Sequence, residues 1–221
     1  MAKFGIVLKI GLLLIITASF FGLSLGCSDE EPSPTPTTTE SPTPTSTGTD
    51  ITTIDPNSIA EESKANFSLA EKKASEWSNS AVLYAVSIKI PNTLNPSEVV
   101  EVYTFGSPAA LQNWWTISIS VRTGNYIRAV IPKEDYLGSN LIPVARKYWK
   151  INYVEALQTA EKNGGKEWRD SISGDIQINE TLMHTDPNNY LYWVVDYQTL
   201  SGSDKLTVKV DANTGEVAKE D

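Results

Sequence analysis

The stretch that most constrains the fold of this chain is KLTVKVDANTGEV, residues 205–217, near the C-terminus. Leu206, Val208 and Val210 alternate with polar residues, and this period of two predicts a strand with one apolar and one solvated side. The Asp-Ala-Asn-Thr-Gly that follows consists mainly of residues that favour turns and positive φ. The stretch therefore predicts a half-buried strand, a tight turn and a return strand that starts at Glu216.

The same pattern occurs earlier in the chain, in WWTISISVRTGNYIRAVI, residues 114–131. Each copy follows a signal for the start of a helix. Ser68 is followed three residues later by Glu71, and Asn152 is followed three residues later by Glu155. We therefore predict an α+β fold of two tandem helix-plus-antiparallel-sheet units.

The two predicted units occupy residues 54–131 and 151–221, and a connection at residues 132–150 joins them. The first helix is predicted to begin at Ser68 and to end at Asn79, and the second is predicted to run from Asn152 to Gly164-Gly165. Segments rich in β-branched and aromatic residues predict further strands at 81–90, 98–105, 126–131, about 171–182, and 190–197.

The first 26 residues have the layout of a secretory signal peptide, with Lys3 and Lys9 before an apolar run that ends in small residues. The run is shorter than the ~20 residues that a permanent membrane-spanning helix needs. Ser24-Leu25-Gly26-Cys27 resembles a bacterial lipobox, with Ser24 where Leu is usual, and the resemblance implies that Cys27 is lipidated. Several acyl chains on Cys27 would anchor an exported protein on the extracytoplasmic face of a membrane. The alternative is an ordinary cleaved signal peptide that leaves a free thiol.

Residues 27–53 are dominated by Ser, Thr and Pro, with scattered acids and no apolar periodicity. Such a segment cannot bury a core, and its proline content favours a stiff spacer over a collapsed coil. We predict a disordered tether that lifts the folded part off the membrane, and a glycosylated stalk is the alternative.

The second predicted unit resembles a PepSY domain, a small module of bacterial envelope proteins in which a helix packs on an antiparallel sheet. The resemblance covers residues 152–219 and rests on Ala156, Ala160 and Gly164-Gly165 in the helix, on WVVDY at 193–197, and on VKVDANTGEV at 208–217. The first unit matches only in the order of its elements and in VRTG at 121–124, where the aspartate of the family ending is missing. The resemblance implies a protein that acts by binding, by restraining peptidases or regulating activity at the cell surface, and it carries over no catalytic residue.

Composition excludes several classes of function. The 221 residues have a formal net charge of −9, and a nucleic acid partner would require a basic face. A single cysteine and a single histidine do not suffice for a multi-thiolate or His-based metal site or a Ser-His-Asp triad. We therefore expect no metal, no cofactor, no nucleic acid and no enzymatic activity.

Three groups of polar residues have simpler explanations than metal binding or catalysis. Asp211, Asn213 and Glu216 have oxygen ligands at calcium-like spacing, but the full calcium-loop pattern is absent and turn capping accounts for them. Asp196 lies on a strand with no second carboxylate placed near it, so it is expected to face solvent. His184 lies in a turn-rich loop, where exposure is the expected state.

The excess of aromatic residues is more informative. Successive side chains of a strand point to opposite sides, so a buried Trp115 implies that Trp114 faces the other way. Tyr190 and Tyr192 similarly share the side opposite Trp193. We predict that Trp114, Tyr190 and Tyr192 form an exposed surface that binds an extracytoplasmic protein such as a peptidase. Three alternatives stay open: these side chains are covered by packing between the units or by a loop, the protein is a surface spacer or adhesive, or it is a hydrolase that uses Asp196 and Asp211.

Overall fold

The computed structural model describes residues 50–138, 140–186 and 188–218. The predicted signal peptide at residues 1–26, the predicted lipidation site Cys27 and the tether up to residue 49 lie outside the described residues.

The described part of the chain contains three α-helices and seven β-strands, which confirms the predicted α+β class. The helices are α1 (Pro56–Trp77), α2 (Tyr153–Ala160) and α3 (Lys166–Ser171). The strands are β1 (Val82–Ile90), β2 (Val100–Gly106), β3 (Asn113–Ser120), β4 (Tyr126–Pro132), β5 (Ile176–Thr185), β6 (Tyr190–Thr199) and β7 (Lys205–Asp211).

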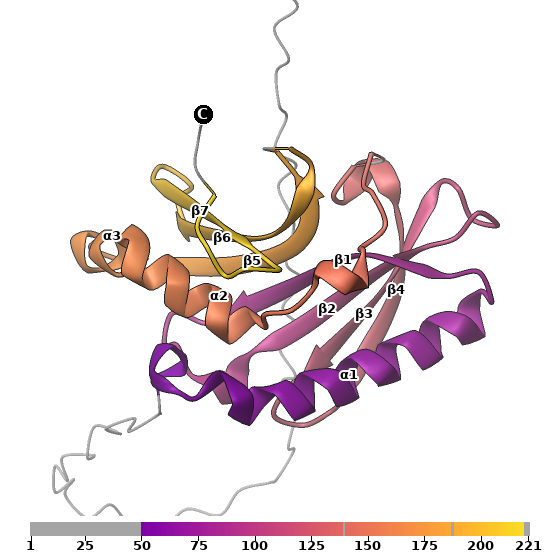
Figure 1. Cartoon of the computed structure of the whole chain (residues 1–221), viewed down its shortest axis with the longest axis horizontal. Coiled ribbons are helices and arrows are strands. Elements are labelled where there is room, and N and C mark those ends of the chain that lie inside the picture. The colour runs from indigo at the N-terminus through magenta and orange to yellow at the C-terminus, as the bar shows by residue number, and fades with distance from the viewer. Residues whose placement is uncertain (1–49, 139, 187, 219–221) are drawn as a thin grey trace, which may run out of the picture. The chain divides into compact units, whose positions relative to one another are not determined.

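All seven strands belong to one antiparallel sheet, in the order β4-β3-β2-β1-β5-β6-β7 (Figure 1). β1 and β5 pair in the middle, with Val86 opposite Leu182 and Ile90 opposite Ile178. Outward from this pair, β2 and β3 follow β1 on one side, and β6 and β7 follow β5 on the other. The order of elements is thus repeated, but the two halves share a single sheet and a single apolar core, and a division into tandem units stays a prediction.

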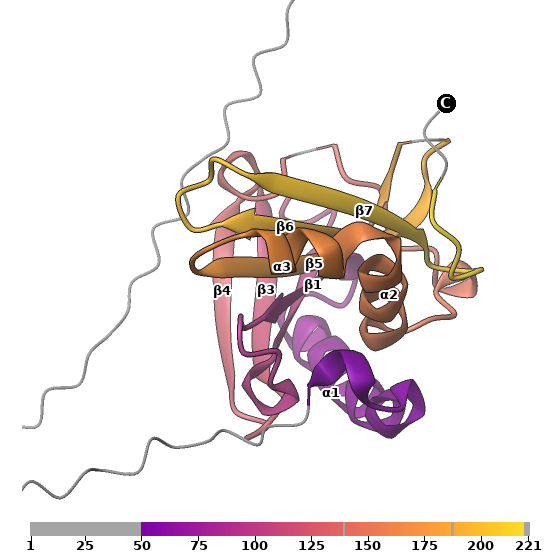
Figure 2. The same cartoon turned by 90° about the vertical axis from the view of Figure 1, so that its left-hand side faces the viewer.

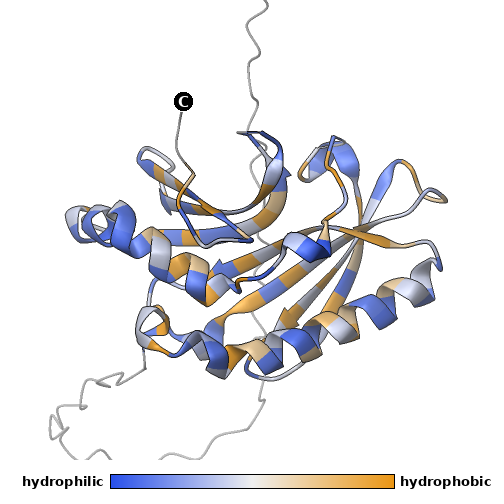
Figure 3. Ribbon diagram, viewed as in Figure 1, coloured by the Kyte–Doolittle hydropathy of each residue, from blue (hydrophilic) through white to orange (hydrophobic). Residues whose placement is uncertain are grey.

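The helices pack on one face of this sheet (Figure 2), and one cluster of buried apolar residues joins them to the strands. Ala70 and Ala74 of α1 and Val154 and Leu157 of α2 belong to that cluster. Apolar and polar residues alternate along several strands (Figure 3), as in β7, where Val208 and Val210 are buried and Thr207 is exposed. β4 is an exception, because nearly all of its residues are exposed. The core-facing side of β3 includes the expected Trp115, Ile117 and Ile119.

The first helix begins earlier than predicted. Asp55 caps α1 by accepting a hydrogen bond from the backbone N–H of Asn57 at 3.0 Å, and Pro56 occupies the first turn, where its missing N–H costs nothing. Ser68 lies inside the helix, where its hydroxyl donates to the carbonyl of Lys64 at 2.8 Å. A serine followed by Glu three residues later is therefore not a helix start here, because the hydroxyl bonds back within the helix.

Ile51–Thr53, which we expected in the tether, form a 3₁₀ helix that Asp50 caps. Ile51 in this turn is fully buried in the core, so the folded part begins before residue 54. A single isoleucine among threonines is too weak a signal for periodicity to detect, and its burial depends on the contacts made by the rest of the fold.

The second helix begins as predicted, because Asn152 and Glu155 form a reciprocal capping box. Gly164 adopts φ 105°, which favours glycine, and it kinks the helical segment before α3, which we did not predict. Because α3 occupies residues 166–171, the next strand starts at Ile176, later than predicted. Gly165 is also required sterically, since a Cβ there would lie 2.3 Å from the Tyr197 hydroxyl oxygen.

A candidate binding pocket on the C-terminal half

A cavity of about 350 Å³ opens at one end of the C-terminal strands. The β5–β6 hairpin, the turn after β7 and the 3₁₀ helix Arg146–Tyr148 surround it. Its lining combines aromatic rings with short polar side chains and one apolar residue: Tyr148, His184, Asn189, Tyr190, Leu191, Asp211 and Asn213.

His184 links two of these segments. Its Nδ1 lies 2.9 Å from the carbonyl oxygen of Asn189, and the backbone N–H of Ala145 donates to its Nε2 at 3.4 Å. The two contacts together require a neutral ring with its hydrogen on Nδ1. His184 is partly exposed, but it is held at both ring nitrogens and forms one wall of the pocket.

Asp211 shapes the opposite wall by capping a turn, as predicted. Its carboxylate accepts hydrogen bonds from the backbone N–H groups of Asn213 at 2.7 Å and Thr214 at 2.9 Å. Gly215 completes the turn at φ 77°. Within residues 50–138, 140–186 and 188–218, no group of three or more His, Cys, Asp and Glu side chains is arranged to hold a metal ion.

The predicted aromatic surface is wrong at Trp114, which is fully buried. Trp114 does face away from Trp115, but the chain after β4 covers it. Its Nε1–H donates to the Gly138 carbonyl at 3.1 Å, and the Lys133 ammonium lies 4.1 Å from its ring centroid. The alternative of a covering loop is therefore the observed one.

Tyr192 is also buried, at 4% exposure, whereas Tyr190 is 56% exposed. Their ring centroids lie 6.5 Å apart, so Tyr190 shields part of its neighbour. Tyr190 is therefore the only residue of the predicted surface that the structure exposes. Its counterpart across the pocket is Tyr148, which is 45% exposed and which we missed because it lies in the segment assigned to a connection.

Asp196 is placed as expected, on the side of β6 away from the core. It pairs with the Lys205 ammonium at 3.0 Å and accepts a hydrogen bond from the Thr207 hydroxyl. Asp211 is opposite Tyr192 on β6, four positions from Asp196, which corresponds to about 13 Å along a strand. The two carboxylates of the hydrolase alternative are thus too far apart to act together.

Sequence reasoning missed two buried carboxyl groups, Glu101 of β2 and Glu180 of β5. Both are opposite Ile88 of β1, so they lie on the core face of the sheet. Glu101 accepts hydrogen bonds from Ser63 Oγ at 2.8 Å, Asn66 Nδ2 at 2.9 Å and the Tyr103 hydroxyl at 2.8 Å. Burial raises the pKa of Glu101, and these three hydrogen bonds oppose that rise.

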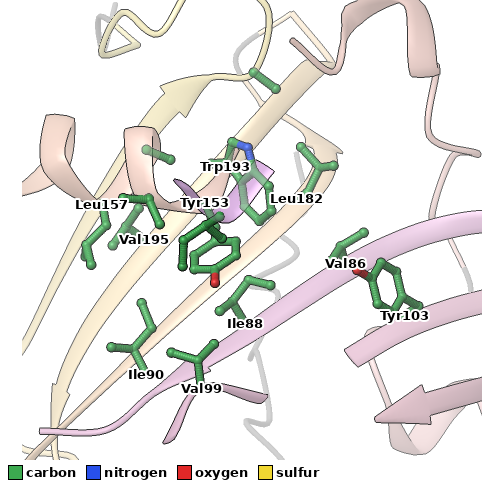
Figure 4. Close-up of a cluster of buried hydrophobic side chains, with 14 of the residues drawn as sticks. Val86, Ile88, Ile90, Val99, Tyr103, Tyr153, Leu157, Leu182, Trp193 and Val195 are labelled. Atoms are coloured by element: carbon green, nitrogen blue, oxygen red, sulfur yellow. The ribbon is translucent and has the colours of Figure 1, made fainter. Parts of the chain in front are cut away.

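Glu180 is fully buried, and neither carboxyl oxygen has a hydrogen-bond partner among the described residues. Burial raises the pKa of Glu180 well above its usual range, and the negative charge of Glu161 adds to the rise. Tyr153 lies with Ile88 and Trp193 in the buried cluster of Figure 4, and burial followed by the charges of Glu101 and Glu180 raises its pKa. The surroundings of Glu180 therefore suit a neutral carboxyl group better than a charged one.

Glu161 has a balancing cation, whereas none of the described residues pairs with Glu180. The Arg169 Nε donates to it at 3.0 Å, and the Tyr197 hydroxyl donates to it at 2.8 Å. This ion pair lies at the edge of a second, larger cavity of about 920 Å³ between residues 50–55 and the α2–α3 segment. Acidic and basic residues are mixed around that cavity, so it has no single preferred charge for a ligand.

Comparisons with known proteins support the resemblance found in the sequence. Residues 150–221 match the family model described as "Peptidase propeptide and YPEB domain" (PepSY). This C-terminal part of the chain, which contains α2, α3 and β5–β7 and the pocket residues from His184 onward, is therefore a PepSY domain.

Among solved structures, the chain is similar to the crystal structure of a protein from Clostridium difficile 630 described as a "putative lipoprotein". The two are 14% identical, the alignment covers 77% of this chain and 96% of that chain, and the TM-score is 0.44. The comparison with curated proteins gave no match. Among the described residues, no helix is both long enough and apolar enough to span a membrane.

Proposed function

We propose that this protein is a non-enzymatic binding or regulatory protein of the cell envelope. Its PepSY domain would hold a segment of an extracytoplasmic protein, such as a peptidase, in the pocket between Tyr148 and Tyr190. The main support for this proposal is the pocket of about 350 Å³, which two exposed tyrosines and Leu191 help to line. Tyrosines with one apolar and one polar end are enriched where proteins bind proteins.

The pocket is also held in one shape, which reduces the entropy cost of binding. His184 ties the β5–β6 hairpin to Ala145, and Asp211 fixes the turn after β7. Lys209 adds a contact from β7 to the Asp186 carbonyl at 2.7 Å. Three walls of the pocket are therefore tied by hydrogen bonds before any partner arrives.

Uniformly charged faces would favour the alternative of a surface spacer or adhesive, and the structure supports it less well. Leu111, Ile127 and Leu200 are all exposed large apolar residues, at separate places on the molecule. The hydrolase alternative fails on the separation between Asp196 and Asp211.

Binding is tested by capturing partners from solubilised membranes with the full chain and with a Tyr148→Ala/Tyr190→Ala variant. Proteins that bind in the pocket should be recovered about tenfold less with the variant, because each buried tyrosine of an interface contributes roughly 1 kcal/mol or more. The matched control is Leu111→Ala/Leu200→Ala, which removes two exposed apolar side chains elsewhere. Equal recovery by both variants and by the unmodified chain would refute the pocket as the binding site.

The location of the protein is a second part of the proposal. We propose that residues 1–26 direct export and that lipid on Cys27 holds the protein on the extracytoplasmic face of a membrane. A Cys27→Ser variant should move from the membrane fraction to the soluble exported fraction, because no acyl chain can then be attached to the thiol. Retention of this variant in the membrane would contradict lipid anchoring.

A further inference from the structure

The two outermost strands of the sheet, β7 and β4, differ in whether a further described segment pairs with them. Beside β7, the residues after the turn add a short bridge, in which Val217 pairs with Val210 and the backbone N–H of Ala218 donates to the Lys209 carbonyl at 2.9 Å. Beside β4, at the other margin of the sheet (Figure 1), no described segment is paired. β4 is thus the open edge of the sheet among the described residues.

The direction of the β4 backbone groups follows from one hydrogen bond. The N–H of Lys133 donates to the Gln112 carbonyl at 2.9 Å, just beyond the pair of Asn113 with Pro132. Because the direction alternates along a strand, the N–H groups of residues 127, 129 and 131 point toward β3. Those of Tyr126, Arg128 and Val130 point away from the sheet, where a further strand could accept them.

The side chains of β4 do little to prevent such pairing. Ile127 is 76% exposed and Val130 is 57% exposed, and Ala129 between them is also exposed. Natural sheets usually protect an edge with several charges, an internal proline or a bulge. β4 has one charged residue, Arg128, and its proline comes only at the end. An exposed strand of this composition is expected to be covered in the working protein.

We infer that β4 pairs antiparallel with β4 of a second copy of this chain, about a two-fold axis at Ala129. In this register Arg128 of one copy is opposite Val130 of the other, and Ile127 is opposite Ile131. All outward N–H groups of Tyr126, Arg128 and Val130 then meet carbonyl groups of the second copy. A shift that places the axis at Arg128 would bring two like charges together, so the sequence of β4 favours one register.

Charges at the two ends of β4 favour a second copy over an unrelated strand. Arg122 precedes the strand, and Glu134 and Asp135 follow it. All three are exposed, and none of them takes part in an ion pair within the described parts of the chain. Antiparallel pairing brings the beginning of one β4 beside the end of the other, so the cation of each copy meets the two acids of its neighbour. The symmetry makes this contact twice.

Cysteine cross-linking tests the register in membranes that contain the full chain. Opposed Ala129 residues would form a non-hydrogen-bonded pair with Cα atoms about 4.5 Å apart, which suits a disulfide. Ala129→Cys should therefore form a disulfide-linked homodimer under mild oxidation, whereas Arg128→Cys should form one only when mixed with Val130→Cys. Thr207→Cys, at an exposed position of β7, is the matched control, and the unmodified chain reports any cross-link through Cys27. Cross-linking of Ala129→Cys no greater than that of Thr207→Cys would overturn the inference, and so would a cross-link to a different protein.

A charge-swap pair tests the same axis without cross-linking. Ala129→Lys and Ala129→Glu each place two like charges at the axis, so each should weaken self-association of the detergent-solubilised chain by about fivefold or more. A mixture of the two should recover association, because each Lys then meets a Glu. Recovery also shows that neither variant is misfolded. Sedimentation that shows a monomer for the unmodified chain at all concentrations, or equal association by every variant, would refute the pairing. This test does not depend on the pocket, which lies in the other half of the sheet.

Discussion

Glu101 and Glu180 lie on either side of Ile88 on the same buried face of the sheet, yet their surroundings differ in one respect. Glu101 accepts three hydrogen bonds, and Glu180 has no partner among the described residues. The difference comes from the donors that surround them. α1 presents Ser63 and Asn66 to Glu101, whereas no described side chain donates a hydrogen bond to Glu180. We therefore expect the two glutamates to have opposite effects on stability, because a buried polar group stabilises only when its partners are present.

The largest effect on stability is expected at Glu101, the carboxyl group that accepts three hydrogen bonds. Glu101→Leu leaves the donors of Ser63, Asn66 and Tyr103 without their acceptor, and it should lower the free energy of unfolding by about 3 kcal/mol. Urea unfolding followed by circular dichroism measures this loss. Asn66→Ala should cost less in the Glu101→Leu background than alone, because its acceptor is already gone. Additive costs would show that the hydrogen bond contributes nothing.

Replacing Glu180 by leucine should change the free energy of unfolding in the opposite direction. Glu180→Leu replaces an unpartnered buried carboxyl by an apolar side chain of similar size, and it should raise the free energy of unfolding by about 1–2 kcal/mol. The urea midpoint should increase without a change in the slope of the transition. A destabilisation like that of Glu101→Leu would mean that Glu180 has a partner in solution and would break the comparison.

The pH dependence of stability should reflect the same contrast. The pKa of Glu180 in the folded protein lies well above its ordinary value of 4.5, so above about that pH the unfolded chain releases a proton that the folded protein retains. The free energy of unfolding should therefore fall as the pH rises from about 4.5 until the folded-state pKa is passed. One group contributes a slope of at most about 1.4 kcal/mol per pH unit.

Glu180→Leu should remove most of this slope between pH 5 and 8, whereas Glu101 contributes in the same direction but is opposed by its hydrogen bonds. The measurement is urea unfolding of both proteins across that range. A parallel pH dependence of the variant and the unmodified chain would show that Glu180 is not the group responsible.

The smallest effect is expected for an exposed acid on the opposite face. Asp196 pairs with Lys205 in a partly solvated position, so Asp196→Ala should change the free energy of unfolding by no more than about 0.5 kcal/mol. The same urea titration provides the value. A loss as large as that of Glu101→Leu would show that the outer face of β6 is covered in the working protein.

Much of the architecture could be predicted from the sequence. The alternation along β3 and β7 and the capping box at Asn152 are local patterns, and each produced the element it predicted. The start of α1 and the burial of Ile51 could not be predicted in this way. Ser68 has the right neighbours for a cap, but the helix was already established from Asp55 onward by a different cap and by contacts with the sheet.

The candidate site was predictable only in part. Period-two reasoning assigned Trp114 and Tyr190 to the side of the sheet away from the core, but it does not show which of them a distant segment covers. Lys133 and Gly138 cover Trp114, whereas the described residues leave Tyr190 more than half exposed. The pairing of Tyr148 with Tyr190 across a pocket joins residues far apart in the sequence, and no local pattern predicts it.

The sequence by itself determined the class of fold, the resemblance of the C-terminal part to PepSY domains and the turn role of Asp211, because each depends on neighbours within a few residues. Only the tertiary structure decided that both halves share one sheet and that the pocket forms. It also decided that, among the described residues, Glu180 has no hydrogen-bond partner and β4 has no strand on its outer side. Those features arise where segments from distant parts of the chain pack together. Burial and hydrogen-bond partners depend on these long-range contacts, which no local sequence pattern specifies.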